Sequence, residues 1–407
     1  MKELFTLGKL NVSDFIPLND GLNYFHKSHE LKLMLEEETG AVRLNECAPL
    51  DSMYGKYWYR SGINQTMKDE LKNVVDSITK VVKLKENDIW LDIACNDGTM
   101  FDYMPKNIIK IGVDPCDDSY KNESEKRANV IIQDYFSYKV YKKCKFGKMK
   151  AKVITIIAMF YDLDKPDPFL QDVFEVLDDD GLLVMQMSYT PLMLKQLAFD
   201  NICHEHIYYY SLFNIKRILE RNGFSIVDCT LNDINGGSFR VFIKKKGKDC
   251  NFYTQPYRDV ANFRVDSLLE YEKTLKLDEK ETWGDFFKRI NQLKEQTVNF
   301  IKQEKAKGKK IWGYGSSTKG NTTLQYFGLD NTLIDGIAER STYKWGLKTS
   351  GTNIPIYSEE EMRQAKPDYM LILPWHFINE FKEREKDYLI GGGKFIVPCP
   401  KFEVVGY

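Results

Sequence analysis

The sequence predicts an α/β protein with two Rossmann-like domains, a small N-terminal β element and a helical connector. Five apolar, β-branched runs alternate with helical patterns in the first half, as in a parallel sheet with crossover helices. A glycine-rich turn between a strand and a helix recurs near the C-terminus. We therefore expect a β element over residues 1–66, a first domain over 67–250, a connector over 251–308 and a second domain over 309–407.

The composition narrows the class of protein. The chain has 407 residues, of which 43% are hydrophobic, and a net charge of −1. A chain so nearly neutral is not expected to bind nucleic acid by bulk electrostatics. No apolar run has the length of a membrane span and the first residues lack a signal peptide's apolar core, so we expect a cytoplasmic protein, monomeric or dimeric. The eight cysteines include no C-x-x-C pair, which predicts reduced thiols without a metal.

The N-terminal element is expected to be a short β structure followed by an aromatic segment. Residues 31–35 and 41–44 predict two strands joined by a turn at 36–40. The run Y-W-Y-R-S-G at 57–62 has two interpretations. It is either a linker packed on the next domain or a lid over a ligand, with its tyrosine hydroxyls and Arg60 as polar groups.

A nucleotide-binding half-fold is predicted next. After an amphipathic helix at 67–84 come a strand at 89–94, a polar loop that opens a helix, and a strand at 108–114. Asp114 ends the second strand, where a carboxylate can accept hydrogen bonds from ribose hydroxyls. The loop has one glycine, Gly98, preceded by Asp97. A carboxylate would repel a pyrophosphate but suits the ammonium group of S-adenosylmethionine, which disfavours NAD.

The remaining strands of this domain place further candidates at one edge of the sheet. Strands are predicted at 130–136, 153–158 and 181–188, and an antiparallel pair at 224–227 and 239–243 ends the sheet as in class I methyltransferases. Ligands of open α/β sheets bind at the carboxyl ends of the strands. The candidate cofactor-binding residues are therefore Asp92, Asn96, Asp97, Gly98, Asp114, Gln133, Asp134, Tyr135, Phe160 and Tyr161, with Tyr59, Ser61 and Met67 from the preceding segment.

The run C-H-E-H at 203–206 is the candidate catalytic centre. It holds two of the five histidines and follows the fifth strand of the first domain. Histidine is a usable base near neutral pH, so His206 is the candidate for removing a proton beside a carbonyl group. A metal site is disfavoured, because helical ligand pairs sit at i, i+4 rather than i, i+2. A buried, purely structural His204 remains an alternative.

The second domain begins with a candidate phosphate loop. Residues 309–321 combine glycines, hydroxyls and one lysine ahead of a predicted helix, and such a loop can hold phosphate through its backbone N–H groups. A structural glycine turn is the alternative. Later strands are predicted at 334–340, 369–376 and 394–397.

Five motifs together resemble a known family. They are Tyr57-x-Tyr59-x-Ser61, L-D-I-A-C-N-D-G-T at 91–99, F-D-x-x-x-H-E-H-x-x-Y-Y-S-L at 199–212, Gly236-Gly237-Ser238-x-Arg240, and G-Y-G-S-S-T-K-G-N-T at 313–322. They are similar to those of the nucleotide-sugar C-methyltransferases. These S-adenosylmethionine enzymes methylate a keto-sugar carbon in making branched deoxysugars.

The resemblance implies roles for particular residues. It implies His206 as the base, Glu205 as its neighbouring carboxylate, and Tyr57 or Tyr59 as a helping tyrosine, with His204 in the same catalytic run. The C-terminal domain would help to enclose a TDP- or GDP-linked sugar. The candidate substrate-binding residues are Cys203, Tyr209, Asn235, Gly237, Ser238, Arg240, Tyr314, Ser316, Ser317, Lys319, Asn321, Glu339 and Lys344.

Two departures from the family pattern stand out. Many members carry a cysteine-ligated zinc near the N-terminus, where this chain has only Cys47, so we expect the zinc to be absent. Members often have a tyrosine directly before H-E-H, where this chain has Cys203. The role of that tyrosine therefore cannot be assigned here.

The predicted activity is C-methylation of a nucleotide-linked 4-keto-6-deoxy sugar at C-3′ with S-adenosylmethionine. Removal of the proton at C3 gives an enolate, whose oxygen needs a donor such as His204 or a tyrosine hydroxyl. One alternative is an O- or N-methyltransferase with the same cofactor domain. Another is a binding module with a degenerate cofactor site, against which Asp97, Gly98 and Asp114 argue.

Overall fold

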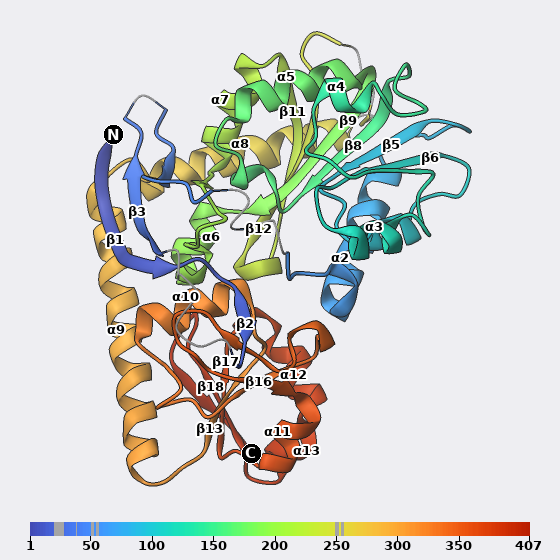
Figure 1. Ribbon diagram of the computed structural model, residues 1–407. Coiled ribbons are helices and arrows are strands. Elements are labelled where there is room, and N and C mark those ends of the chain that lie inside the picture. The colour runs from blue at the N-terminus through green and yellow to red at the C-terminus, as the bar shows by residue number, and fades with distance from the viewer. Residues whose placement is uncertain (20–27, 38, 50–52, 54–56, 249–251, 254–255) are drawn as a thin grey trace.

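The computed structural model describes residues 1–407 except 20–27, 38, 50–52, 54–56, 249–251 and 254–255. Glu38 of the predicted turn and the predicted boundary at residue 250 lie outside the described residues. In Figure 1 a seven-stranded domain lies above the C-terminal domain, and the long helix α9 runs along one side of the molecule. In the part of the chain that is described, no helix is long and apolar enough to cross a membrane.

The upper domain has the strand order of a class I methyltransferase, as predicted. Its sheet runs β11-β12-β9-β8-β5-β6-β7, and β12 is antiparallel to both of its neighbours. The other neighbouring pairs are parallel. The strands are β5 (Ile89–Ile93), β6 (Ile109–Val113), β7 (Val130–Ile132), β8 (Ala151–Ile157), β9 (Leu177–Ser188), β11 (Phe224–Asn232) and β12 (Ser238–Lys245).

Helices and short turns connect these strands. They are α2 (Gln65–Thr79), α3 (Asp118–Ser124), α4 (Tyr138–Tyr141), α5 (Pro166–Val176), α6 (Thr190–Lys195) and α7 (Leu212–Arg221). The helix predicted to open after β5 is replaced by a single 3₁₀ turn, η2 (Thr99–Asp102). Pro105 follows it closely and lacks the N–H that a continuing helix would need.

The N-terminal β element is completed by a strand from the upper domain. The strands β1 (Lys2–Asn11), β3 (Ser28–Leu35) and β4 (Val42–Leu44) form one antiparallel sheet with β10 (Tyr208–Tyr209). The predicted strands at 31–35 and 41–44 are present. The two tyrosines that follow the C-H-E-H run therefore belong to the N-terminal sheet, which fixes the position of that run.

The C-terminal domain is a second parallel α/β unit, as predicted. Its sheet has the order β16-β14-β13-β17-β18-β19, and β19 is antiparallel to β18. Its strands are β13 (Ile311–Tyr314), β14 (Ile337–Glu339), β16 (Ile356–Ser358), β17 (Tyr369–Ile372), β18 (Lys394–Val397) and β19 (Glu403–Val405). Its helices are α10 (Thr318–Phe327), α11 (Glu359–Ala365), α12 (Ile378–Arg384) and α13 (Lys386–Ile390).

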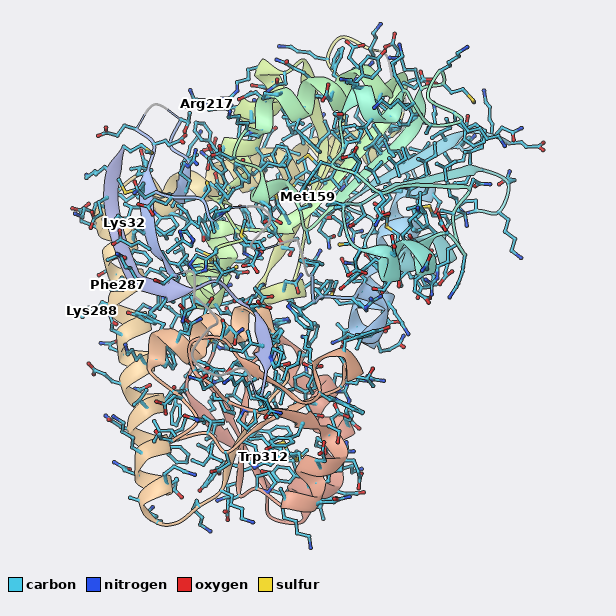
Figure 2. All side chains as sticks on the ribbon, in the orientation of Figure 1. Lys32, Met159, Arg217, Phe287, Lys288 and Trp312 are labelled. Carbon is cyan, nitrogen blue, oxygen red and sulfur yellow. The ribbon has the colours of Figure 1, made fainter. Side chains whose placement is uncertain are left out.

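The connector and the N-terminal chain join the two domains. The connector forms α8 (Tyr257–Leu275), which packs against β11, and α9 (Lys280–Ala306). Figure 2 shows Phe287 of α9 beside β1, where its ring stacks on Phe5 with 4.7 Å between centroids. The strand β2 (Phe15–Pro17) pairs with β15 (Leu347–Thr349) of the C-terminal domain. One continuous core therefore extends through the N-terminal sheet, α9 and the C-terminal sheet.

Candidate active site

Asp114 organises the edge of the sheet where β5 and β6 end. Its Oδ2 accepts the backbone N–H of Asn96 at 2.7 Å and its Oδ1 accepts that of Cys116 at 2.9 Å. Each carboxylate oxygen keeps a further lone pair for a ligand hydroxyl. The residue stands at the position predicted for a ribose contact.

The loop after β5 has left-handed backbone at three alternating positions. The φ angles are 62° at Ala94, 52° at Asn96 and 74° at Gly98. A Cβ on Gly98 would lie 2.7 Å from Cα of Ser124. Glycine is therefore required at 98 for both its backbone conformation and its space.

The aromatic segment predicted as a linker or a lid is fastened directly to this loop. The Asn96 side chain donates to the carbonyl of Tyr59 and accepts from the N–H of Ser61, both at 3.0 Å. Asp97 accepts the N–H of Gly62 at 2.8 Å. The segment therefore contacts the candidate cofactor loop through its backbone, a placement that fits both the linker and the lid interpretation.

Arg60 links this segment to two other elements. Its guanidinium lies 3.8 Å from the ring centre of Tyr120 in α3 and 4.5 Å from that of Tyr343 in the C-terminal domain. It also donates to the hydroxyl of Ser119 at 2.5 Å, and the Tyr120 hydroxyl donates to the carbonyl of Tyr57. The segment is therefore held from both domains.

Some of the other predicted cofactor-binding residues lie at the carboxyl edge of the sheet, and others lie in the hydrophobic core. Gln133, Asp134 and Tyr135 are exposed at the end of β7. Gln133 donates to the carbonyl of Cys116, next to Asp114. Met159, labelled in Figure 2, lies two residues after the end of β8 and marks the same edge.

Three candidates lie beneath this edge. Phe160 is fully buried against Phe169 and Tyr210, which makes it a core residue. Asp92 is buried and accepts a hydrogen bond from Thr155, and burial raises the pKa of Asp92 to about 8. Met67 is buried in α2.

His206 is held as a neutral base. Its Nδ1 lies 2.8 Å from the carbonyl oxygen of Asn201, which can only accept, so Nδ1 carries the proton and Nε2 keeps its lone pair. The ring packs edge-on against Tyr161, with 4.4 Å between centroids. Burial and the nearby charge of Lys319 lower the pKa of His206 to about 3.

Glu205 is a buried carboxylate with an open oxygen. Among the residues that the structure describes, none donates a hydrogen bond to its Oε2. Burial raises the pKa of Glu205 to about 7, although the Cys203 thiol hydrogen-bonds to the carboxylate and opposes that rise. Cys203, predicted to be a substrate-binding residue, is thus a buried partner of Glu205.

His204 faces away from these two groups. It is 3% exposed, and its Nε2 donates to the carbonyl of His29 in β3 at 3.2 Å. Burial lowers the pKa of His204 to about 4. These contacts favour the structural interpretation of His204 and disfavour it as a donor to an enolate.

We call the contact between the upper domain and the C-terminal domain the seam. On the upper side it consists of residues 199–206 and 235, and on the other side of Lys319, Trp375 and His376. The indole N–H of Trp375 donates to Oδ2 of Asp200 at 3.1 Å, and Lys319 donates to the carbonyl of Asn235 at 3.1 Å. The Phe199 ring stacks on Phe327 of α10 with 5.3 Å between centroids.

Four buried polar atoms, in residues 200–209 and in His376, have no hydrogen-bond partner within the described part of the chain. They are Oε2 of Glu205, Oδ1 of Asp200, the Tyr209 hydroxyl and Nδ1 of His376. Buried polar groups are ordinarily satisfied, so such a concentration indicates a place for a polar ligand. Trp375 and His376 were missed from the sequence, although they follow β17 at its carboxyl end, where ligands bind.

The predicted phosphate loop bonds largely to the protein itself. Ser316 donates both its N–H and its hydroxyl to Glu339, and Lys344 donates to the carbonyl of Ser316. Ser317 caps α10 by accepting the N–H of Gly320. The remaining candidates also have protein partners, Glu385 for Tyr314 and the carbonyl of Asp14 for Asn321.

Arg240 is a structural residue of the upper domain. Its guanidinium donates to Gln186 of β9 and, in α2, to Glu70, Asn73 and Ser77. Ser238 bonds to the carbonyl of Ile234, and a Cβ on Gly237 would lie 2.5 Å from the Leu192 side chain. The structure thus places this motif in internal packing, whereas Asn235 reaches the seam.

A search for metal-binding clusters finds none of three or more His, Cys, Asp or Glu side chains in the described ranges. Within these ranges Cys47 is exposed and lies near Arg43 and Asp164.

Comparisons with known proteins agree with this architecture. Residues 63–228 match a family model described as a methyltransferase domain, and residues 233–400 match one described as a C-methyltransferase C-terminal domain. The chain is 27% identical over 356 residues to C-methyltransferase NovU of Streptomyces niveus, a match that covers 87% of this chain and 82% of that protein.

Two solved methyltransferases resemble part of the chain loosely. Magnesium protoporphyrin IX methyltransferase from Synechocystis PCC 6803 with bound S-adenosylmethionine covers 45% of this chain and 79% of its own, at 11% identity and a TM-score of 0.32. A Clostridium acetobutylicum ATCC 824 S-adenosylmethionine-dependent methyltransferase covers 44% and 92%, at 13% identity and 0.35. The assignment of class therefore rests on strand order and the family models.

The strand order, the β5–β6 edge and the methyltransferase model define an S-adenosylmethionine-dependent methyltransferase with the class I fold. More particularly, the chain is a C-methyltransferase similar to NovU, with the C-terminal domain of such enzymes after the methyltransferase domain.

Proposed function

We propose that this C-methyltransferase acts on a nucleotide-linked 4-keto-6-deoxy sugar, at the carbon C-3′ beside the keto group. The observation that carries the proposal is the set of unpartnered polar atoms around Glu205 and His206, between the cofactor edge and the C-terminal domain. A sugar offers several hydroxyl groups and one carbonyl, and so can satisfy such a set. The nucleotide, as TDP or GDP, would extend toward the C-terminal domain.

The β5–β6 edge suits S-adenosylmethionine. Asp114 is positioned for ribose hydroxyls, and Asp97 places a carboxylate near the loop for the ammonium group. The glycine at position 98 lets the loop turn tightly against Ser124, which holds Asp97 in place. When bound, S-adenosylmethionine supplies an electrophilic methyl group.

The work of the protein is to remove a proton from the sugar carbon. A carbon beside a ketone becomes nucleophilic once its proton is removed and an enolate forms. Nε2 of His206 and the carboxylate of Glu205 are the two acceptors that we assign to this step, and we call this pair the proton site. A positioned base contributes about 10²–10⁴-fold to such a step. The pKa of about 7 at Glu205 is close to the optimum for a base at neutral pH.

The distinctive test is proton exchange without methyl transfer. In D₂O without S-adenosylmethionine, the protein should wash deuterium into C-3′ of thymidine- or guanosine-diphosphate 4-keto-6-deoxy sugars. No exchange and no methylation with either sugar would reject the proposed substrate class. An O- or N-methyltransferase would have no reason to exchange that proton.

The base is tested by His206→Ala, with His29→Ala as a matched histidine control in β3. His206→Ala should bind S-adenosylmethionine normally by calorimetry while losing exchange and methyl transfer. Full activity in this variant would remove His206 from the mechanism. The His29 ring is partly buried beside His204 but does not contact His206 or Glu205, so the control should stay within about twofold of the parent protein.

A further inference from the structure

Lys319 crosses from the C-terminal domain into the seam. It is the second residue of α10, and its ammonium group donates to the carbonyl of Asn235 in the upper domain at 3.1 Å. An ammonium group has three N–H donors, so this bond leaves two for other partners. The side chain therefore delivers a cation from one domain to the other.

The charge of Lys319 acts on the groups around the proton site. It lowers the pKa of His206 and of His376, in each case after the larger effect of burial. Burial lowers the pKa of Lys319 itself, while the nearby carboxylate of Asp200 opposes that change. The ammonium group thus lies within electrostatic range of both sides of the seam.

A phosphate-binding role fits these contacts less well. Ser316 and Ser317 of the glycine-rich loop bond to Glu339 and to the first turn of α10. Lys319 instead reaches the carbonyl of Asn235, and its helix α10 packs against residues 199–201. The sugar ring, rather than the pyrophosphate, would therefore be its neighbour.

The reaction needs a positive group at this place. When the proton leaves the carbon, its electron pair moves toward the keto oxygen, which gains negative charge. His204 is turned away toward His29 and does not supply the required donor. A single preorganised donor to such an oxygen is worth about 10²–10³-fold in rate.

We propose that Lys319 is a catalytic residue, whose ammonium group donates to the keto oxygen and stabilises the enolate while the proton site takes the proton. This inference rests on the proposed function. It changes the expected role of Lys319 from a phosphate contact to a group at the reacting atoms. It also makes the C-terminal domain part of the catalytic centre.

The test compares Lys319→Met with the parent protein on thymidine- and guanosine-diphosphate 4-keto-6-deoxy sugars. The kcat and the deuterium exchange rate without S-adenosylmethionine should fall together by about 10²–10³-fold. Calorimetry should show unchanged S-adenosylmethionine binding. Lys319→Arg, which keeps the charge, should retain more activity than Lys319→Met. A raised KM with unchanged kcat would overturn the inference and indicate a substrate-binding role.

Lys294→Met is the matched control. Lys294 is a partly buried lysine of α9 whose ammonium group lies over the Tyr326 ring, outside the seam. The kcat and the deuterium exchange rate of Lys294→Met should match those of the parent protein. An equal loss in both variants would indicate a general structural effect and would overturn the inference.

A third measurement requires no substrate. The His206 imidazole can be titrated by NMR in the parent protein and in Lys319→Met, where its pKa should rise because a neighbouring positive charge is removed. An unchanged pKa would overturn the placement of Lys319. A parent protein that exchanges no proton on either sugar would overturn the proposed function instead, while the titration would still test the placement.

Discussion

Glu205 and His206 are adjacent in sequence but differ in their proton affinities because their surroundings differ. Burial disfavours the charged form of each, which raises the pKa of the carboxyl group to about 7 and lowers that of the imidazole to about 3. Near neutral pH the histidine is therefore wholly neutral, while the glutamate is close to half-ionised.

Glu205→Gln should remove one limb of the pH–rate profile. Only the ionised carboxylate can take a proton, so activity that depends on it is present above pH 7 and falls as the pH drops through about 7. In Glu205→Gln we expect this limb to vanish and the rate above pH 7 to fall by about 10²–10⁴-fold. Profiles of kcat/KM between pH 5 and 9 measure both the limb and the rate above pH 7.

The exposed Glu220→Gln, whose partner is Lys216, serves as the control and should keep the limb. A limb near pH 7 that persists in Glu205→Gln would assign it to another group.

Gly98→Ala should disrupt the cofactor loop. An alanine would combine a φ of 74° with a Cβ only 2.7 Å from Ser124. We expect the free energy of unfolding to fall by about 1–3 kcal/mol, and S-adenosylmethionine affinity to fall with it. Urea unfolding and calorimetry measure the two effects.

Gly247→Ala separates backbone strain from the steric clash. Gly247 has nearly the same φ, 75°, but a Cβ there meets nothing within 4 Å. If both variants lost the same free energy of unfolding, the close contact with Ser124 would contribute nothing to the effect of Gly98→Ala.

At the scale of the elements, the packing of α2 on the sheet depends on one buried ion pair. Arg240 of β12 and Glu70 of α2 are 4% and 8% exposed, with 2.8 Å between Nη2 and Oε1. Burial lowers the pKa of Arg240, but the neighbouring carboxylate opposes this effect. Removing one partner leaves the other charge buried and unpaired, which is more costly than losing both.

Arg240→Met should therefore destabilise the fold by about 3–5 kcal/mol without a specific effect on sugar binding. Glu70→Gln combined with Arg240→Met should recover part of that loss. Urea unfolding and the KM for the sugar are the measurements. A raised KM with unchanged stability would restore Arg240 as a substrate-binding residue.

At the scale of the whole molecule, Arg60 joins the cofactor loop to the C-terminal domain. Its two aromatic neighbours, Tyr120 and Tyr343, come from different domains. Each cation–π contact is worth about 0.5–1 kcal/mol. The position of the aromatic segment is therefore energetically coupled to that of the C-terminal domain.

Arg60→Met should weaken S-adenosylhomocysteine binding by roughly 1–2 kcal/mol, about 5–30-fold in Kd. Calorimetry measures the effect. Arg217→Met, which loses an exposed contact with the Phe213 ring, is the control and should bind normally. Unchanged affinity in Arg60→Met would mean that the segment is held without it.

Local patterns in the sequence predicted both Rossmann-like units. The β-branched runs gave the strands, and the strand-end rule placed Asp114 at its edge, because both follow from side-chain periodicity and chain direction. The same rule was less successful where packing competes with it. It placed Phe160 at the site, although its ring is buried against Phe169 and Tyr210.

The sequence by itself determined the order of the two α/β units, and it predicted the acidic loop after β5 and the C-H-E-H run as candidate sites. Only the tertiary structure decided which way each side chain of that run faces. The pairing of β10 with β4 and the contact of Asp200 with Trp375 turn His204 toward the N-terminal sheet and leave His206 and Glu205 at the seam. These contacts join residues more than 150 positions apart, and no local periodicity encodes such partners.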